Sequence, residues 1–182
     1  MHTKLRARTR HAHETAEQAM SLQCRLASLE AYGDLLVRLW SLHSAFELQL
    51  GKLSRTTVDI DFDSRRRAHW LAEDIRHLGR EPGAPRTLAR SIDSMEEAIG
   101  ALYVLEGSTL GGQVILRQAT RLPGISPTRG ARFFWGHAEK TSTLWMAFID
   151  VLNLVDPVSA EARMIEEAAL RTFDEFVAGL RA

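Results

Sequence analysis

The chain has 182 residues, a length at which a substantial core can be buried within one domain, and we expect a single domain over residues 1–182. Its 23 lysines and arginines balance 23 aspartates and glutamates, and the resulting formal net charge of zero argues against a general nucleic-acid or membrane-surface binder. A single cysteine, Cys24, excludes an internal disulfide and fits a reducing compartment.

The first predicted helix runs from Leu5 to Met20, with Leu5, Thr9 and Ala16 along one face and charged residues on the other. The opening sequence, MHTKLRARTRHAHE, lacks the apolar core of a signal peptide. The chain also has no run of about 18 uncharged apolar residues, the length that a membrane-spanning helix needs. We therefore predict a soluble, cytoplasmic protein without a membrane span.

Two further helices are predicted before the middle of the chain. Ser28 caps the first, which covers residues 29–50 and repeats leucine at helical spacing. A polar connection over residues 51–63 leads to a shorter helix at residues 64–79, which ends at a glycine. The loop sequence REPGAPRT follows.

Residues 94–122 form the stretch around which we expect the rest to be organised. Ser94, with a glutamate three positions on, has the capping-box pattern of a helix start, and apolar residues then recur at roughly helical spacing. Gly107, Gly111 and Gly112 interrupt this run, although a glycine costs a helix about 0.5–1 kcal/mol relative to alanine. Two explanations for these glycines remain open. One is tight helix packing or a kink, and the other is close approach of a flat ligand to Gly107 and Gly111, which share a face.

The last third of the chain contains two more predicted helices. A loop at residues 123–134 precedes a helix near Thr141–Leu154, and the pair Asp156 and Pro157 ends that helix. The final helix begins at about Ser159. With five prolines in all and no run of alternating apolar and polar residues, the sequence predicts an all-α fold.

The seven histidines include one candidate metal ligand. No histidine forms an HExxH motif and no Cys/His group has zinc spacing, but a single histidine can serve as an axial iron ligand. His13 is the best placed, because Glu17 one turn on can orient its imidazole and Arg6 one heptad earlier points to the same side. His11 points to the opposite side of the helix. The same pattern also describes a solvated helix face, and the residues alone leave both interpretations open.

Four segments, taken in order, carry a family pattern. LRARTRHAHETAE resembles the LR..T...H..AE opening of the biliverdin-producing haem oxygenases, and YVLEGSTLGGQVI resembles the glycine-rich distal helix of that family, particularly in its bacterial members. ARFFWGHAEKTSTLWMAFIDVLN and EEAALRTFDEFVAGL are similar to the segment and the terminal helix that follow in the family. The resemblance therefore covers nearly the whole chain.

This resemblance implies a helical bundle that holds haem between a proximal helix and a kinked distal helix. His13 would ligate the iron, Glu17 would lie beside it, and Arg6 would pair with a haem propionate. Gly107 and Gly111, with Gly112, would let the distal backbone pass close over the haem and bound dioxygen. By their location, further candidates for propionate pairing are Arg129, Arg132 and Lys140. Phe173 and Phe176 match aromatic positions of the family's last helix, where they either line the pocket or pack in the core.

The reaction implied by the resemblance is oxidative cleavage of haem, as both cofactor and substrate, to biliverdin, carbon monoxide and ferrous iron. Electrons would come from an external ferredoxin-, flavoprotein- or ascorbate-type donor, because the chain has no GxGxxG fingerprint and no cysteine cluster. Both iron acquisition and supply of a bilin to a photoreceptor fit. No nucleic-acid or membrane partner is expected.

Three positions depart from the family pattern or leave a role open. Ser108 follows Gly107 where animal-type members have an acidic residue that organises water, an acid that bacterial members commonly lack as well. His137 replaces an aromatic residue and is either a polar group near the pocket or a surface histidine. Glu106 is either an acid or the structural partner of an arginine.

Two other functions would use the same scaffold. One is a haem-binding or haem-transfer protein without turnover, and the other is a helical module that binds another protein. A thiamin-degrading enzyme of a related helical superfamily would need a catalytic cysteine, and Cys24 in the short segment SLQCR is a poor candidate.

Overall fold

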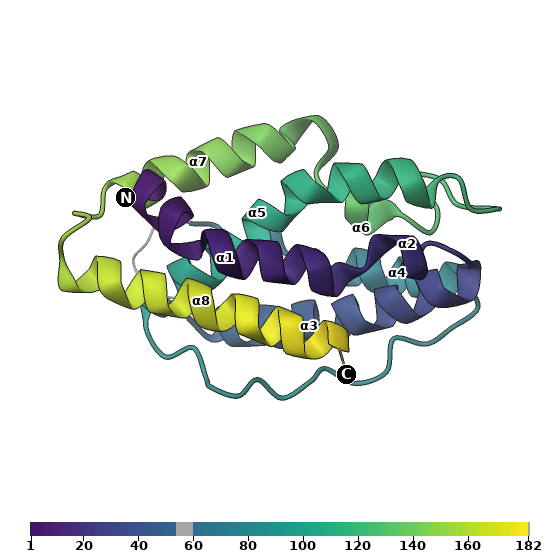
Figure 1. The fold of residues 1–182 in the computed structure, drawn as a ribbon, viewed down its shortest axis with the longest axis horizontal. Helices are drawn as coiled ribbons and strands as arrows, with labels where there is room; N and C mark the ends of the chain where they lie inside the picture. The colour runs from purple at the N-terminus through teal and green to yellow at the C-terminus, as the bar shows by residue number, and fades with distance from the viewer. Residues whose placement is uncertain (54–59, 182) are drawn as a thin grey trace.

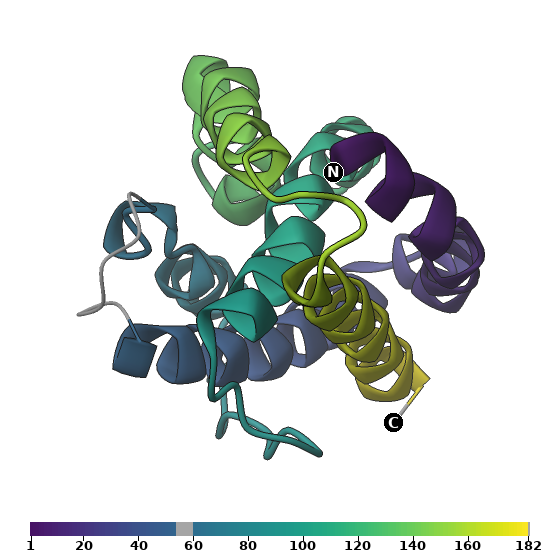
Figure 2. The ribbon, with the colours of Figure 1, turned by 90° about the vertical axis from the view of Figure 1, so that its left-hand side faces the viewer.

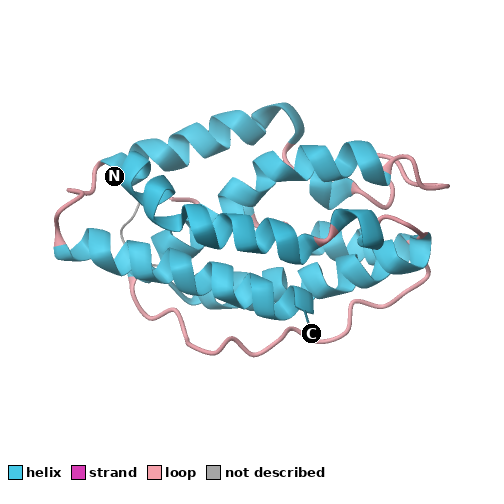
Figure 3. Cartoon of the chain, in the orientation of Figure 1, coloured by secondary structure: helices cyan, strands magenta, loops and turns pink. Residues whose placement is uncertain are grey.

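The structure is a computed structural model, and it describes residues 1–53 and 60–181. These residues form eight α-helices and two short 3₁₀ turns, which confirms the all-α prediction (Figure 3). The α-helices are α1 (His2–Met20), α2 (Leu22–Arg25), α3 (Leu29–Leu53), α4 (Ala68–His77), α5 (Met95–Ala119), α6 (Arg132–Trp135), α7 (Thr141–Asn153) and α8 (Ala160–Arg181), and the 3₁₀ turns are η1 (Asp63–Arg65) and η2 (Ala138–Lys140).

The helix starts that the sequence predicts from serine caps are present. The Ser28 hydroxyl accepts the backbone N–H three residues on at the start of α3, and the Ser94 hydroxyl does the same at the start of α5. The Glu97 carboxylate accepts the N–H of Asp93 rather than that of Ser94, so the second half of the capping box is shifted by one residue. Its other oxygen receives Arg171 of α8 at 2.7 Å, which joins the start of α5 to the last helix.

The helix predicted at residues 64–79 is shorter than expected. The 3₁₀ turn η1 and an extended residue, Arg66, precede it, and α4 begins only at Ala68. Glu47 of α3 explains this start, because its Oε1 accepts the backbone N–H of Arg67 at 2.7 Å and of Ala68 at 2.9 Å. A carboxylate twenty positions earlier thus supplies the cap that the local sequence lacks.

Helix α5 is the centre of the bundle (Figure 2). It packs against α8, α6, α7 and α3, and most of its first half is buried. The closest approach is at Gly100, where an added Cβ would lie 2.5 Å from the carbonyl oxygen of Ile165 and 2.6 Å from the Cβ of Ala168. Gly100 therefore lets α5 and α8 touch backbone to backbone.

The N-terminal helix packs alongside α8 (Figure 1). Lys4 pairs with Glu166 of α8 at 2.7 Å, and the guanidinium of Arg25 in α2 donates to the carbonyl of Leu180. The start of α1 is docked on α7, because the terminal ammonium and the N–H of His2 both donate to the Oδ1 of Asn153. Helix α8 is thus a common support for α1 and α5.

One helix among the described residues is long and apolar enough to cross a membrane. It is α5, with a mean hydropathy of 1.3 over its most apolar window. Of that window, 67% is buried inside the bundle, which is the position of a core helix. Its apolar character is therefore explained by packing.

Candidate functional site

One face of the second half of α5 is apolar and uncovered, and we call it the open strip. It consists of Gly107, Leu110, Gly111 and Val114, which helical geometry places on one side. The side chains of Leu110 and Val114 are 46% and 44% exposed. A Cβ added at Gly111 would meet no described atom within 4 Å, and one added at Gly107 would meet the edge of Trp145 at 3.7 Å. Bare backbone beside exposed apolar side chains suits close contact with a flat, apolar ligand.

Gly112 differs from the two glycines of the open strip. It is buried, and an added Cβ would lie 3.2 Å from the carbonyl oxygen of Phe134 in α6. The two explanations left open by the sequence therefore apply to different residues. Gly112 allows close helix packing, whereas Gly111 leaves backbone uncovered and Gly107 faces the edge of Trp145 at van der Waals distance.

His13 projects from α1 with 58% of its side chain exposed. Its Nδ1 lies 3.5 Å from Oε1 of Glu17, and its ring meets the ring of Phe173 in α8 edge-on, with centroids 5.8 Å apart. Since Nδ1 is the ring nitrogen that lies near Glu17, Nε2 is directed away from that carboxylate. This is the arrangement in which a carboxylate fixes the orientation of a ligating histidine.

Two arginines share the face of α1 that carries His13. Arg6 and Arg10 lie two turns and one turn before it, are exposed, and form no ion pair with any residue that the structure describes. Uncompensated guanidinium groups of this kind can bind carboxylates. The sequence analysis singled out Arg6 but missed Arg10, which its spacing of three residues from His13 identifies.

The start of α1 meets α5 next to the open strip. The ring of His2 lies 6.3 Å from that of Tyr103, one helical turn before Gly107. From this contact α1 and the second half of α5 run in the same general direction (Figure 1). Helix α1 therefore carries His13 onward from the end of the open strip.

Arg132 has other partners. Its guanidinium stacks over the ring of Trp70 at 3.9 Å and lies 5.1 Å from that of Trp135, and it also donates to the carbonyl of Gly136. Its backbone N–H donates to Asp74 at 2.9 Å. These contacts hold Arg132 between α4 and α6. The other propionate candidates, Arg129 and Lys140, are exposed.

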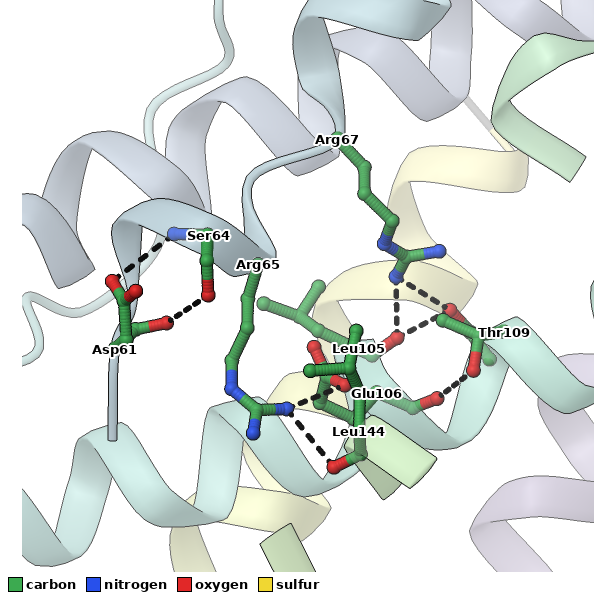
Figure 4. A network of polar contacts seen from close by, with 9 residues as sticks. Asp61, Ser64, Arg65, Arg67, Leu105, Glu106, Thr109 and Leu144 are labelled. Atoms are coloured by element: carbon green, nitrogen blue, oxygen red, sulfur yellow. Dashed lines mark hydrogen bonds and ion pairs between the residues drawn. The ribbon is translucent and has the colours of Figure 1, made fainter. Parts of the chain in front are cut away.

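A buried ion pair joins η1 to α5 (Figure 4). Arg65 Nη1 donates to Glu106 Oε2 at 2.8 Å and to the carbonyl of Leu144 at 3.3 Å, and the two charged side chains are 8% and 3% exposed. Of the two roles left open for Glu106, the structure shows the pairing with an arginine. The sequence analysis missed Arg65, whose signal was the run SRRR, interpreted as the start of a helix.

Arg67 extends this polar network to the surface of α5. Its Nη2 donates to the carbonyl of Leu105 at 2.6 Å and lies 3.4 Å from the hydroxyl of Ser108, which itself donates to that carbonyl at 2.6 Å (Figure 4). Burial lowers the pKa of Arg67, while the nearby carboxylates of Glu106 and Glu47 raise it. A cationic donor thus reaches the residue that follows Gly107.

His137 is a neutral base beside the same network. Burial, and then the charges of Arg67, Arg132 and Arg65, lower its pKa to about 4. Its ring packs against Trp70, and its buried Nε2 has no hydrogen-bond partner among the described residues. Of the two roles left open for His137, the buried nitrogen favours a polar group inside the fold over a solvated surface histidine.

A small cavity lies behind the ion pair. Its volume is about 20 Å³, which is room for one water molecule. Polar side chains in its lining are His43, Glu47, Arg65, Arg66, Arg67 and Glu106. The buried Nε of Arg65 has no described partner, so a water in this cavity would complete its hydrogen bonding.

Comparison with known proteins identifies a family. The family model for Heme oxygenase matches residues 1–182. The chain is 35% identical over 125 residues to a haem oxygenase of Xanthomonas campestris, with 68% of this chain and 73% of that protein covered. It is 27% identical over 114 residues to haem oxygenase PigA of Pseudomonas aeruginosa, with 62% and 57% covered.

A solved structure shares the fold. It is the NO- and CO-bound haem oxygenase of Neisseria meningitidis, which superimposes with a TM-score of 0.81 at 24% identity and covers 98% of this chain and 89% of that one.

Proposed function

Since the chain belongs to the haem oxygenase family, we propose that this haem oxygenase cleaves haem to biliverdin, carbon monoxide and ferrous iron, as a single domain in the cytoplasm. The observation that carries the proposal is the open strip of α5, with its exposed apolar side chains and bare backbone. Helix α1, which starts beside the strip, carries an exposed imidazole. When bound, haem supplies the iron at which dioxygen is activated and also the carbon that is oxidised.

The proximal side of the site uses residues of α1 and α8. His13 ligates the iron through Nε2, and Glu17 holds Nδ1 so that the ring keeps one orientation. Phe173 packs against the imidazole ring and excludes water from that side. Arg6 and Arg10 pair with the propionates, which are the only charged groups at the haem rim. The donor set fits haem because it offers one neutral ligand, two free cations and an apolar face.

The distal side uses the open strip and the network behind it. Gly107 and Gly111 leave room for dioxygen where any larger residue would fill the space. The Ser108 hydroxyl, polarised by Arg67, presents a polar group at the edge of the strip to hold an ordered water, through which protons are delivered. Gly112 supports the strip from behind by admitting Phe134.

The chain depends on partners for electrons. A ferredoxin-, flavoprotein- or ascorbate-type donor would supply them, and either iron use or a bilin-binding photoreceptor would take the products. Neither choice depends on the residues of the site.

The test is a hemin titration of the protein and of the His13→Ala variant. We expect one-to-one binding with a strong Soret band, and loss of the histidine-ligated spectrum in the variant. His11→Ala is the matched control, because His11 is exposed on the opposite side of the same helix and should leave the spectrum unchanged. An unchanged ferric spectrum in His13→Ala would remove the ligand assignment.

Turnover is tested by adding ascorbate under air. We expect the Soret band to decay and a verdin-type band to appear. Haem that stays intact under these conditions would instead identify a haem carrier, and absence of hemin binding would point to a protein-interaction module.

A further inference from the structure

An aromatic side chain of α7 closes one end of the open strip. The six-membered ring of Trp145 stands against Gly107, with its Cη2 and Cζ3 atoms 3.7 and 3.8 Å from the position of an added Cβ. Tyr103, one turn earlier on α5, is 9% exposed, and its ring centroid lies 6.0 Å from that of Trp145. We call Tyr103, Trp145 and the adjoining His2 the aromatic wall.

Beyond the wall the strip has no such boundary. No described atom lies within 4 Å of a Cβ added at Gly111, and the side chain of Val114, at the far end of the strip, is 44% exposed. A flat ligand placed on the strip would therefore be stopped in one direction along α5 and free in the other.

Contacts from three helices fix the wall. The ring of His2 meets that of Trp145 edge-on at 5.8 Å, and Phe148 packs against Trp145 from one turn further along α7. The backbone of His2 is tied to Asn153 of α7. Because His2 and His13 belong to one helix, about 16 Å apart at 1.5 Å per residue, the wall keeps a fixed distance from the imidazole.

We propose that Trp145 is a positioning residue that determines which meso edge of the haem is attacked. The inference rests on the proposed function. With the iron held by His13 and the propionates by the exposed side chains of Arg6 and Arg10, the macrocycle can still rotate about the bond from the iron to the imidazole. The indole limits that movement on one side, so the orientations that bring a substituted edge against Trp145 are excluded on steric grounds. The remaining orientations select the meso carbon that lies under Gly107 and Gly111.

The test compares Trp145→Ala and Trp145→Phe with Met146→Ala. Met146 is the next residue of α7, and its side chain is 55% exposed, so it controls for substitution in this helix. Each protein is titrated with hemin, the hyperfine-shifted haem methyl resonances of the ferric complex are recorded by proton NMR, and the biliverdin isomers formed with ascorbate are separated.

We expect Trp145→Ala to bind hemin one-to-one, to show an additional set of methyl resonances, and to change the isomer ratio by about tenfold, the discrimination that one missing steric group of this kind supplies. Trp145→Phe should give an intermediate ratio, and Met146→Ala should match the parent. Circular dichroism verifies folding, and if the alanine variant does not fold, the phenylalanine variant provides the comparison.

A failure of the inference about Trp145 and a failure of the proposed function give different results. If the parent turns over haem and the Trp145 variants keep its methyl resonances and isomer ratio, the inference about Trp145 is wrong and the proposed function stands. If the parent binds no hemin, the proposed function is wrong, and the role proposed for Trp145 is wrong as well.

Discussion

Two halves of a single face of α5 use glycine for opposite purposes. Gly100, Gly107 and Gly111 are separated by seven and four residues, so all three lie on one side of the helix. At Gly100 that side is covered by α8 so closely that a Cβ would lie 2.5 Å from a carbonyl oxygen. At Gly111 no described atom lies within 4 Å. A missing side chain thus creates contact in the first half and space in the second.

The difference shows that the role of a glycine in a helix depends on the atoms that face it. Backbone-to-backbone packing at Gly100 stabilises the bundle directly, because it brings α5 and α8 together. The bare backbone at Gly111 makes no stabilising contact of this kind, and the glycine weakens the helix by about 0.5–1 kcal/mol. Residues that cost stability without packing against anything are typical of binding sites.

The largest effect is expected at the junction between the two halves, where Glu106 pairs with Arg65. Glu106→Ala leaves a buried guanidinium without its partner, and such a break costs about 3–5 kcal/mol of unfolding free energy. Urea unfolding measures it. The double variant Arg65→Met with Glu106→Leu should recover most of the loss, and no recovery would mean that the pair does more than balance charge.

A smaller loss is expected in the covered half. Gly100→Ala places a methyl group against the backbone of α8, which cannot move aside as a flexible side chain would, and overpacking of this kind costs about 1–3 kcal/mol. The unfolding midpoint in urea should fall accordingly. A variant as stable as the parent would contradict the covered half of the comparison.

The smallest effect on stability is expected in the open half, with the opposite sign. Gly111→Ala should raise the free energy of unfolding by about 0.5–1 kcal/mol, because it favours the helix and meets no neighbour. The same methyl group stands where the proposed site places dioxygen, so turnover of hemin should fall. Higher stability with unchanged turnover would separate Gly111 from the active site.

The sequence predicts well the features that neighbouring residues decide. The starts of α3 and α5 follow from Ser28 and Ser94, because each caps an N–H only three positions away. The start of α4 was predicted too early because its cap, Glu47, comes from another helix. Local patterns cannot supply a partner twenty residues distant.

The residues of the candidate site also divide into those that local spacing predicts and those that depend on tertiary contacts. A periodic sequence suffices to place Arg6, Arg10, His13 and Glu17 on one face of α1, although what they bind stays a prediction. Arg67 was missed, since its importance depends on a contact with Ser108 forty-one positions later. Gly112 and Arg132 were grouped with the ligand-facing residues, yet the structure packs one against Phe134 and the other between two tryptophans. These differences arise from tertiary packing, which spacing does not encode.

The contacts of α8 with both α1 and α5 have a consequence for biosynthesis. This helix follows the others in the chain, and it supports both α1, which carries His13, and α5, which carries the open strip. Until residues 160–181 have been synthesised, only the first residues of α1 contact α5 and α7, and the part of α1 that carries His13 lacks its support. We therefore expect haem to bind only after α8 has been synthesised and has packed against both helices.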